Sequence, residues 1–167
     1  QGIALGALVQ GVAVADRAYA GGWWDWLTPF SMLCGVSVII GYALLGATWL
    51  IMKTAGPVQE RARNLAWLFG VATVLSIGAV SLITPFLDSV YYYRWFEWPG
   101  SAISAPVPIA VGLILLLLFR SLTVHQHEYR PFVLSLILFA LCFVGLGSSI
   151  FPDLIPPDVT ILDAATP

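Results

Sequence analysis

The sequence predicts an all-α membrane protein, a transmembrane four-helix bundle that is part of a larger polytopic subunit. Of the 167 residues, 59% are apolar and only 10% are charged, and the mean hydropathy is +0.90. A chain of this size keeps a large surface, so it cannot hide that much apolar area from water. Four apolar runs also reach the length that crosses a hydrocarbon layer of about 30 Å as a helix. Lipid is therefore the expected solvent.

Residues 1–22 are expected to hold the end of a truncated helix and an outer connection. The opening QGIALGALVQGVAV contains roughly a dozen apolar residues, fewer than the about 20 that a spanning helix needs. It also lacks the positively charged flank of a signal peptide. We therefore interpret it as the last turns of a helix that starts before Gln1.

Residues 23–167 are expected to form the four-helix bundle, followed by an outer C-terminal loop. The runs are continuous and show no two-residue alternation, which favours helices over barrel strands. Prolines at the starts of two runs suit an early helical position, where the missing N–H is least costly. None of the spans contains a charged residue or a histidine, and they are expected over residues 29–52, 64–87, 101–119 and 131–151.

The basic residues predict the orientation of the bundle. Cytoplasmic connections of membrane proteins carry an excess of Lys and Arg. Two connections on one side hold most of the basic residues: Lys53, Arg61, Arg63, Arg120 and Arg130. That side is expected to be cytoplasmic. The opposite side carries aromatic residues that favour the headgroup level, among them Trp23, Trp24, Trp26, Trp95 and Trp98.

No catalytic, cofactor-binding or metal-binding residue is predicted in this chain. A membrane haem needs axial ligands, usually His or Met, in or near the hydrocarbon. The two histidines, His125 and His127, lie instead beside Glu128 in a cytoplasmic connection, where a solvated loop is favoured over a metal site. The spans also lack the ionisable residue that a transporter core or proton relay usually keeps. The net charge of −2 argues against a nucleic-acid partner.

Small residues on the spans have two interpretations. At a spacing of four they let helices approach closely, which drives association in lipid. Packing inside this bundle is favoured, and contact with another subunit stays open. The residues are Ser37, Gly41, Ala43, Ala47, Ala72, Ser76, Ala79, Gly145 and Ser149.

Three further features have simple interpretations. The thiols Cys34 and Cys142 lie in apolar runs and are expected to be buried and to pack as small apolar groups. Span hydroxyls such as those of Thr48 and Ser135 could line a water path, but more often bond to their own helix backbone. The aromatic outer connection over residues 87–108 could stack a quinone ring, although an interfacial anchor is favoured.

The stretch WWDWLTPFSMLCGVSVIIGYALLGATWLIMKTAGPVQERARNLA, residues 23–66, resembles subunit II of the cytochrome bd family of bacterial quinol oxidases. The likeness is nearest to the cyanide-insensitive branch. The upstream GALVQGV is similar to a helix end of that subunit, and the tail FPDLIPPDVTILDAATP to the outer loop before its final helix. The chain would then be a fragment from the C-terminal half, the second four-helix bundle.

The resemblance implies a multi-pass protein of the bacterial inner membrane that forms a heterodimer with a haem-bearing subunit I. That subunit would bind the haems and quinol, and the complex would reduce O₂. This chain would bind no cofactor alone, would support assembly and cofactor retention, and would be surrounded by lipid, with a structural quinone or lipid left open. The enzyme activity would belong to the complex. The alternative is a small transporter or scaffold without redox cofactors.

Overall fold

The computed structural model describes residues 1–11, 14–15, 18–87, 105–124, 127–150, 153–155 and 159–160. The elements are α1 (Gly2–Gln10), β1 (Val14–Ala15), β2 (Ala18–Tyr19), α2 (Pro29–Lys53), α3 (Pro57–Ile83), the 3₁₀ turn η1 (Thr84–Phe86), α6 (Pro106–Thr123), α7 (Arg130–Ile150), β3 (Asp153–Ile155) and β4 (Val159–Thr160). The strands form two antiparallel pairs, β1 with β2 and β3 with β4.

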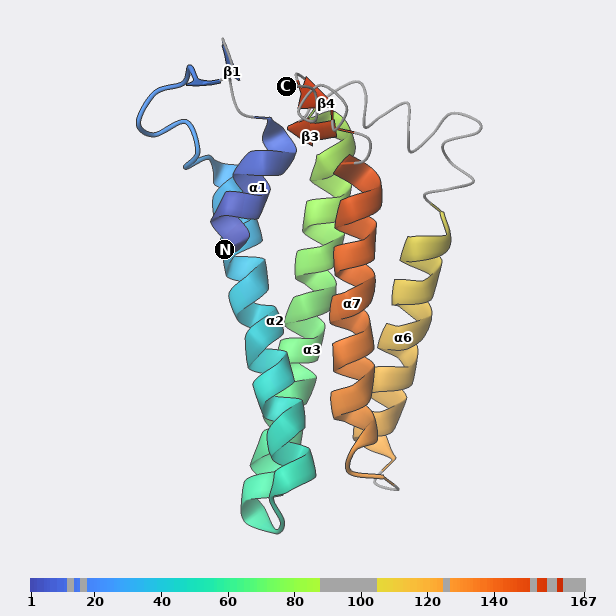
Figure 1. Ribbon diagram of the computed structural model, residues 1–167. Helices are drawn as coiled ribbons and strands as arrows, with labels where there is room; N and C mark the ends of the chain where they lie inside the picture. Colours follow the sequence, from blue (N-terminus) through green and yellow to red (C-terminus); the bar gives the residue numbers. More distant parts are fainter. Residues whose placement is uncertain are drawn as a thin grey trace.

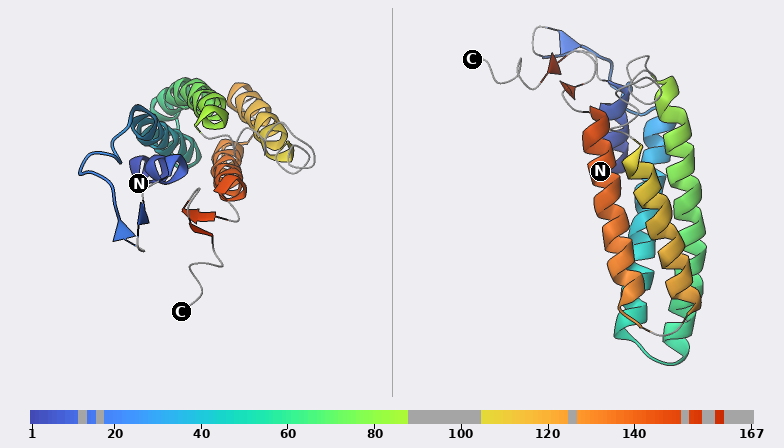
Figure 2. Two further views of the ribbon diagram at one scale, coloured as in Figure 1. Left: turned by 90° about the horizontal axis from the view of Figure 1, so that it is seen from above. Right: turned by 90° about the vertical axis from the view of Figure 1, so that its right-hand side faces the viewer.

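Four helices of the described chain are long and apolar enough to cross a membrane: α2, α3 with η1, α6 and α7. They lie side by side as a bundle, which confirms the predicted fold class (Figure 1). Contacts run from α3 to α2, from α2 to α7, from α7 to α6 and from α6 back to α3, so the four helices close into a ring (Figure 2).

The two short connections lie at the same end of the bundle, here called the inner end. Figure 1 shows the α2–α3 and α6–α7 turns at the bottom and the short strands at the opposite, outer end. The predicted topology required these turns to share one side of the membrane, and the arrangement agrees with that requirement. Its assignment to the cytoplasm still rests on the charge rule.

Helix α2 begins with a capping box formed by Thr28 and Ser31. Thr28 is the N-cap, and its side chain accepts a hydrogen bond from the backbone N–H of Ser31 at 3.0 Å. The Ser31 hydroxyl in turn accepts one from the Thr28 backbone N–H at 2.9 Å. This reciprocal pair, with Pro29 in the first turn, satisfies helix donors that would otherwise lack partners in lipid.

Helix α3 begins earlier than the hydropathy pattern predicts. It starts at Pro57, seven residues before the expected Asn64, and the connection from α2 shrinks to residues 54–56. Gly56 has φ +64° and ψ −141°, a conformation that only glycine adopts easily. Polar residues ended the predicted span, but Glu60 and Arg61 are good helix formers and extend the helix past the apolar region. Arg61 and Arg63 are therefore helical residues, not loop residues.

Helices α6 and α7 follow the predicted spans with shifted ends. Helix α6 starts at Pro106 and continues to Thr123, past the expected end at residue 119. Helix α7 runs over Arg130–Ile150. The expected starts and ends at residues 101–104 and 151 lie outside the described residues.

Helix α1 packs on the outer half of α2 through small residues (Figure 1). A Cβ added at Gly6 would lie 2.7 Å from Ser31 Cα, and one added at Gly35 would lie 2.6 Å from Ile3 Cγ1. The two backbones therefore approach each other more closely than larger side chains allow.

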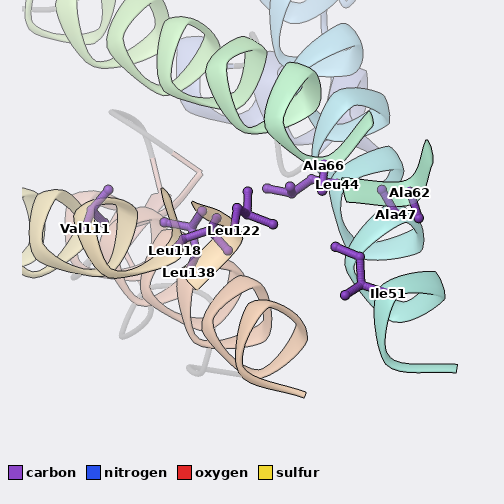
Figure 3. Close-up of a cluster of buried hydrophobic side chains, with 9 residues drawn as sticks. All are labelled: Leu44, Ala47, Ile51, Ala62, Ala66, Val111, Leu118, Leu122 and Leu138. Carbon is purple, nitrogen blue, oxygen red and sulfur yellow. The ribbon is translucent and has the colours of Figure 1, made fainter. Parts of the chain in front are cut away.

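The buried apolar side chains of the described residues form two clusters, and the smaller one, around Val9 and Phe30, lies at the outer end. The larger cluster joins all four spanning helices, and its buried members are Leu44, Ala47, Ile51, Ala62, Ala66, Val111, Leu118, Leu122 and Leu138. In Figure 3 the three leucines 118, 122 and 138 gather between α6 and α7, while alanines 47, 62 and 66 lie where α2 meets α3. Alanines at the α2–α3 contact and leucines at the α6–α7 contact set how closely each pair of helices approaches.

Candidate functional site

A buried polar contact joins α2 to α7 in the core. Thr48 Oγ1 lies 2.9 Å from Ser135 Oγ, and both side chains are fully buried. Each hydroxyl also lies within hydrogen-bond distance of a carbonyl of its own helix, Leu44 O at 2.9 Å and Phe132 O at 2.8 Å. Both hydroxyls are thus satisfied without water.

The same helix pair approaches closely at Gly41. A Cβ at this position would lie 2.7 Å from Phe139 Cζ, so the ring lies directly on the α2 backbone. Tyr42 stacks on Phe139 with ring centroids 5.6 Å apart. The hydroxyl contact and the glycine–ring contact together define the α2–α7 seam.

Arg63 is the buried cation of the described chain. Its side chain, near the start of α3, is 8% exposed. Its Nη1 atom is fully buried and has no hydrogen-bond partner among the described residues. A buried guanidinium nitrogen without an acceptor lowers stability, because its lost hydration is not replaced.

A groove of about 410 Å³ opens at the inner ends of α6 and α7. It is lined by Leu117, Arg120, Ser121, Val124, His127, Tyr129, Arg130, Val133 and Leu134. The His127 ring stacks on that of Tyr129, with centroids 5.7 Å apart. The groove therefore combines two arginines, two hydroxyls and an imidazole with apolar walls.

The structure describes one of the two histidines. His127 is exposed and lines the groove, whereas His125 lies outside the described residues. Within the described ranges, no three His, Cys, Asp or Glu side chains gather as a metal site would require. Residues 88–104 of the outer connection, where a quinone ring could stack, also lie outside those ranges.

Several of the small residues serve internal packing. Gly41 contacts Phe139, Ala47 is buried in the core, and a Cβ at Gly145 would meet Val107 at 3.0 Å. The sequence pattern did not single out glycines that face open space. Around Gly46, Gly78, Gly112 and Gly147, an added Cβ would have no neighbour within 4 Å.

The hydroxyls of the spans bond mainly to their own helices, as expected. Ser37 Oγ donates to Leu33 O at 2.7 Å, and Thr73 Oγ1 donates to Phe69 O at 2.7 Å.

The expectation that both cysteines are buried is wrong. Both are free, but Cys34 is half-buried and Cys142 is exposed on the surface of α7. An apolar run does not by itself say which face of a spanning helix looks outward.

The outer end presents a tryptophan cluster. Trp23 and Trp24 are 92% and 71% exposed, and the Trp26 indole donates a hydrogen bond to Trp23 O at 2.8 Å. The rings of Trp24 and Trp26 stack with centroids 6.4 Å apart. Exposed indoles beside the start of α2 suit the membrane–water interface.

The fold and these sites define a class of protein: a polytopic α-helical membrane protein whose described spans carry polar contacts but no charged residue in mid-span. The family comparison is more specific. A model of the cytochrome bd terminal oxidase subunit II family matches residues 1–167. The chain belongs to this family, which functions in respiratory electron transport at the bacterial inner membrane.

A relative from Haemophilus influenzae agrees with this assignment. The chain is similar to its "probable cytochrome oxidase subunit 2", with 34% identity over 80 residues. The matched stretch covers 45% of this chain and 21% of that protein. The chain thus corresponds to a limited part of its relative's length.

Proposed function

We propose that this chain acts as the non-haem subunit II of a cytochrome bd-type quinol:O₂ oxidoreductase, of the cyanide-insensitive branch. In this role it packs against a haem-bearing subunit I as a heterodimer and supports the assembly of that subunit and its retention of cofactors. Quinol oxidation and O₂ reduction would take place in subunit I. The family match over the whole chain carries this proposal.

The donor set of the described residues supports a role without haem ligation. A haem needs axial His or Met side chains placed on its two faces. His127 lies at the exposed inner end, Met52 near the inner end of α2, and Met32 near the outer end of the same helix. None of these three side chains lies in the middle of a described span, so we infer that the haems bind to the partner subunit.

The outward glycines support association with another membrane protein. Gly46 on α2 and Gly112 on α6 leave open notches in otherwise apolar surfaces. In lipid, small residues at a helix surface allow a neighbouring helix to approach closely. We infer that subunit I or lipid fills such notches.

The main test is deletion and complementation in the source bacterium. Loss of the full-length subunit should remove the haem bands of the oxidase from reduced-minus-oxidised spectra of membranes, and should remove quinol-dependent O₂ uptake. Complementation with the native gene should restore both. Complementation with Gly41→Leu, which disturbs the α2–α7 seam, should restore less haem than the native gene does.

Normal haem bands in the deletion strain would contradict the assembly role. A tagged full-length subunit that purifies without haem or a partner would contradict the oxidase assignment altogether. The transporter or scaffold alternative is not favoured by the family match.

The inferred orientation has its own test. We expect a cysteine at Ala55, in the α2–α3 turn, to react with a membrane-impermeant maleimide only from the cytoplasmic side. A cysteine at Trp23 should react only from the opposite side, in a variant whose native cysteines are replaced by alanine. Labelling of Ala55→Cys in intact spheroplasts would show that the orientation is the reverse of the one inferred.

A further inference from the structure

The groove between the inner ends of α6 and α7 has the charge of an anion site. Arg120 contributes from the last turn of α6 and Arg130 from the first residue of α7. Glu128, the acidic residue between them in sequence, is exposed and is not among the lining residues. Two guanidinium groups without a lining carboxylate favour a phosphate-like ligand, which each can bind with paired N–H donors.

Polar groups beside the arginines suit the same ligand. Ser121 and Tyr129 bring hydroxyl groups to the lining, and His127 stacks on the Tyr129 ring. The groove also lies at the N-terminus of α7, whose first backbone N–H groups point toward its inner end. Helix N-termini attract anions, so the backbone adds to the attraction of the side chains.

The groove continues from this polar end into an apolar wall. Leu117 lies one helical turn deeper into the membrane than Arg120, and Leu134 lies one turn deeper than Arg130. Val133 lines the same α7 face and is 44% exposed. A free inorganic anion would leave this wall uncovered, whereas a lipid would cover it with its acyl chains.

The groove lies where lipid headgroups lie. Helices α6 and α7 span the membrane and end within a few residues of the arginines, which places the polar part at the interface. Basic pockets between spanning helices on the cytoplasmic side are suited to anionic headgroups. A neutral quinone ring would not need two arginines.

We propose that this groove binds one anionic phospholipid of the inner leaflet, with its phosphate between Arg120 and Arg130 and an acyl chain along Leu117 and Leu134. The site is independent of haem and of the subunit's role in assembly.

The test uses the full-length subunit in its purified, delipidated complex. The dissociation constant for phosphatidylglycerol should rise about fivefold for each arginine lost. This is the change expected when one basic group near an anionic lipid surface is removed. Native mass spectrometry would measure binding to the Arg120→Gln, Arg130→Gln and double variants. Arg61→Gln is the matched control, because Arg61 is an exposed basic residue of the inner end outside the groove.

The proposal is overturned if the double variant binds phosphatidylglycerol as tightly as Arg61→Gln does. It is also overturned if phosphatidylethanolamine binds equally well, or if inorganic phosphate alone displaces the lipid at equal concentration, because the occupant would then not be an anionic lipid. Should the double variant fail to assemble, a photoreactive phosphatidylglycerol added to native complex decides the question. Crosslinks within residues 117–134 support the site, and crosslinks only elsewhere in the complex refute it.

Discussion

Two buried polar sites in the inner half of the bundle differ in whether their polar atoms all have hydrogen-bond partners. The hydroxyls of Thr48 and Ser135 contact each other and also reach carbonyls of their own helices. The guanidinium of Arg63 is nearly as well buried, but its Nη1 atom has no acceptor among the described residues. A hydroxyl needs few partners and finds them on its own helix, whereas a guanidinium has five N–H groups to satisfy.

The difference explains where each group lies. Thr48 and Ser135 occupy helix interiors because their own backbone satisfies them even before the helices meet. Arg63 lies in the second turn of α3, close to the membrane surface, where water or a partner can reach its remaining donors. In this bundle, satisfied hydroxyls belong to the core and the cation belongs to its edge.

The largest effect is expected from filling the α2–α7 seam. Gly41→Leu places side-chain atoms where the Phe139 ring lies, so it should lower the unfolding free energy by about 1–3 kcal/mol. The measurement is reversible unfolding of the full-length subunit in mixed detergent micelles. Gly46→Leu on the same helix meets no neighbour and should change stability little. Equal losses in both variants would contradict the tight seam.

Replacing the buried cation should be neutral or favourable. Arg63→Met removes an unsatisfied guanidinium while keeping its apolar length, so we expect a gain of up to about 1 kcal/mol. The same unfolding measurement applies, with exposed Arg61→Met as the matched control. A loss of several kcal/mol in the assembled complex, absent from the isolated subunit, would instead show that Arg63 pairs with a carboxylate of another chain.

The smallest effect is expected at the hydroxyl contact. A double-mutant cycle with Thr48→Val and Ser135→Ala should give a coupling energy of about 0.6 kcal/mol, the usual size for such contacts in membranes. Each single variant leaves the other hydroxyl bonded to its own helix, so neither creates an unsatisfied group. A coupling of zero would mean that the two hydroxyls are neighbours without a mutual bond.

Hydropathy sufficed to predict the spans but not how they meet. The four helices and the shared side of their short connections follow from apolar length and basic residues. The start of α3 was missed because Glu60 and Arg61 continue a helix beyond the lipid, where propensity and Gly56 decide rather than hydropathy.

The candidate sites depended on pairings that no local pattern contains. Gly41 was singled out as a small residue, but Phe139 as its partner lies on another helix. The groove is lined by both Arg120 and Arg130, which lie on either side of a turn. In the sequence, the two arginines served only to predict the orientation of the bundle. Contacts between distant helices depend on helix rotation, and uniformly apolar spans carry little information about rotation.

The three-residue turn at residues 54–56 also bears on the order in which the bundle is built. Because this turn is short, helices α2 and α3 are synthesised in close succession and can enter the bilayer together as a hairpin. Helices α6 and α7 can do the same. The contact between Thr48 and Ser135 spans 87 positions, so it cannot form until α7 has been synthesised. The α2–α7 seam therefore forms only after both hairpins have been made, and a defect there would leave two correctly inserted hairpins separate in the membrane.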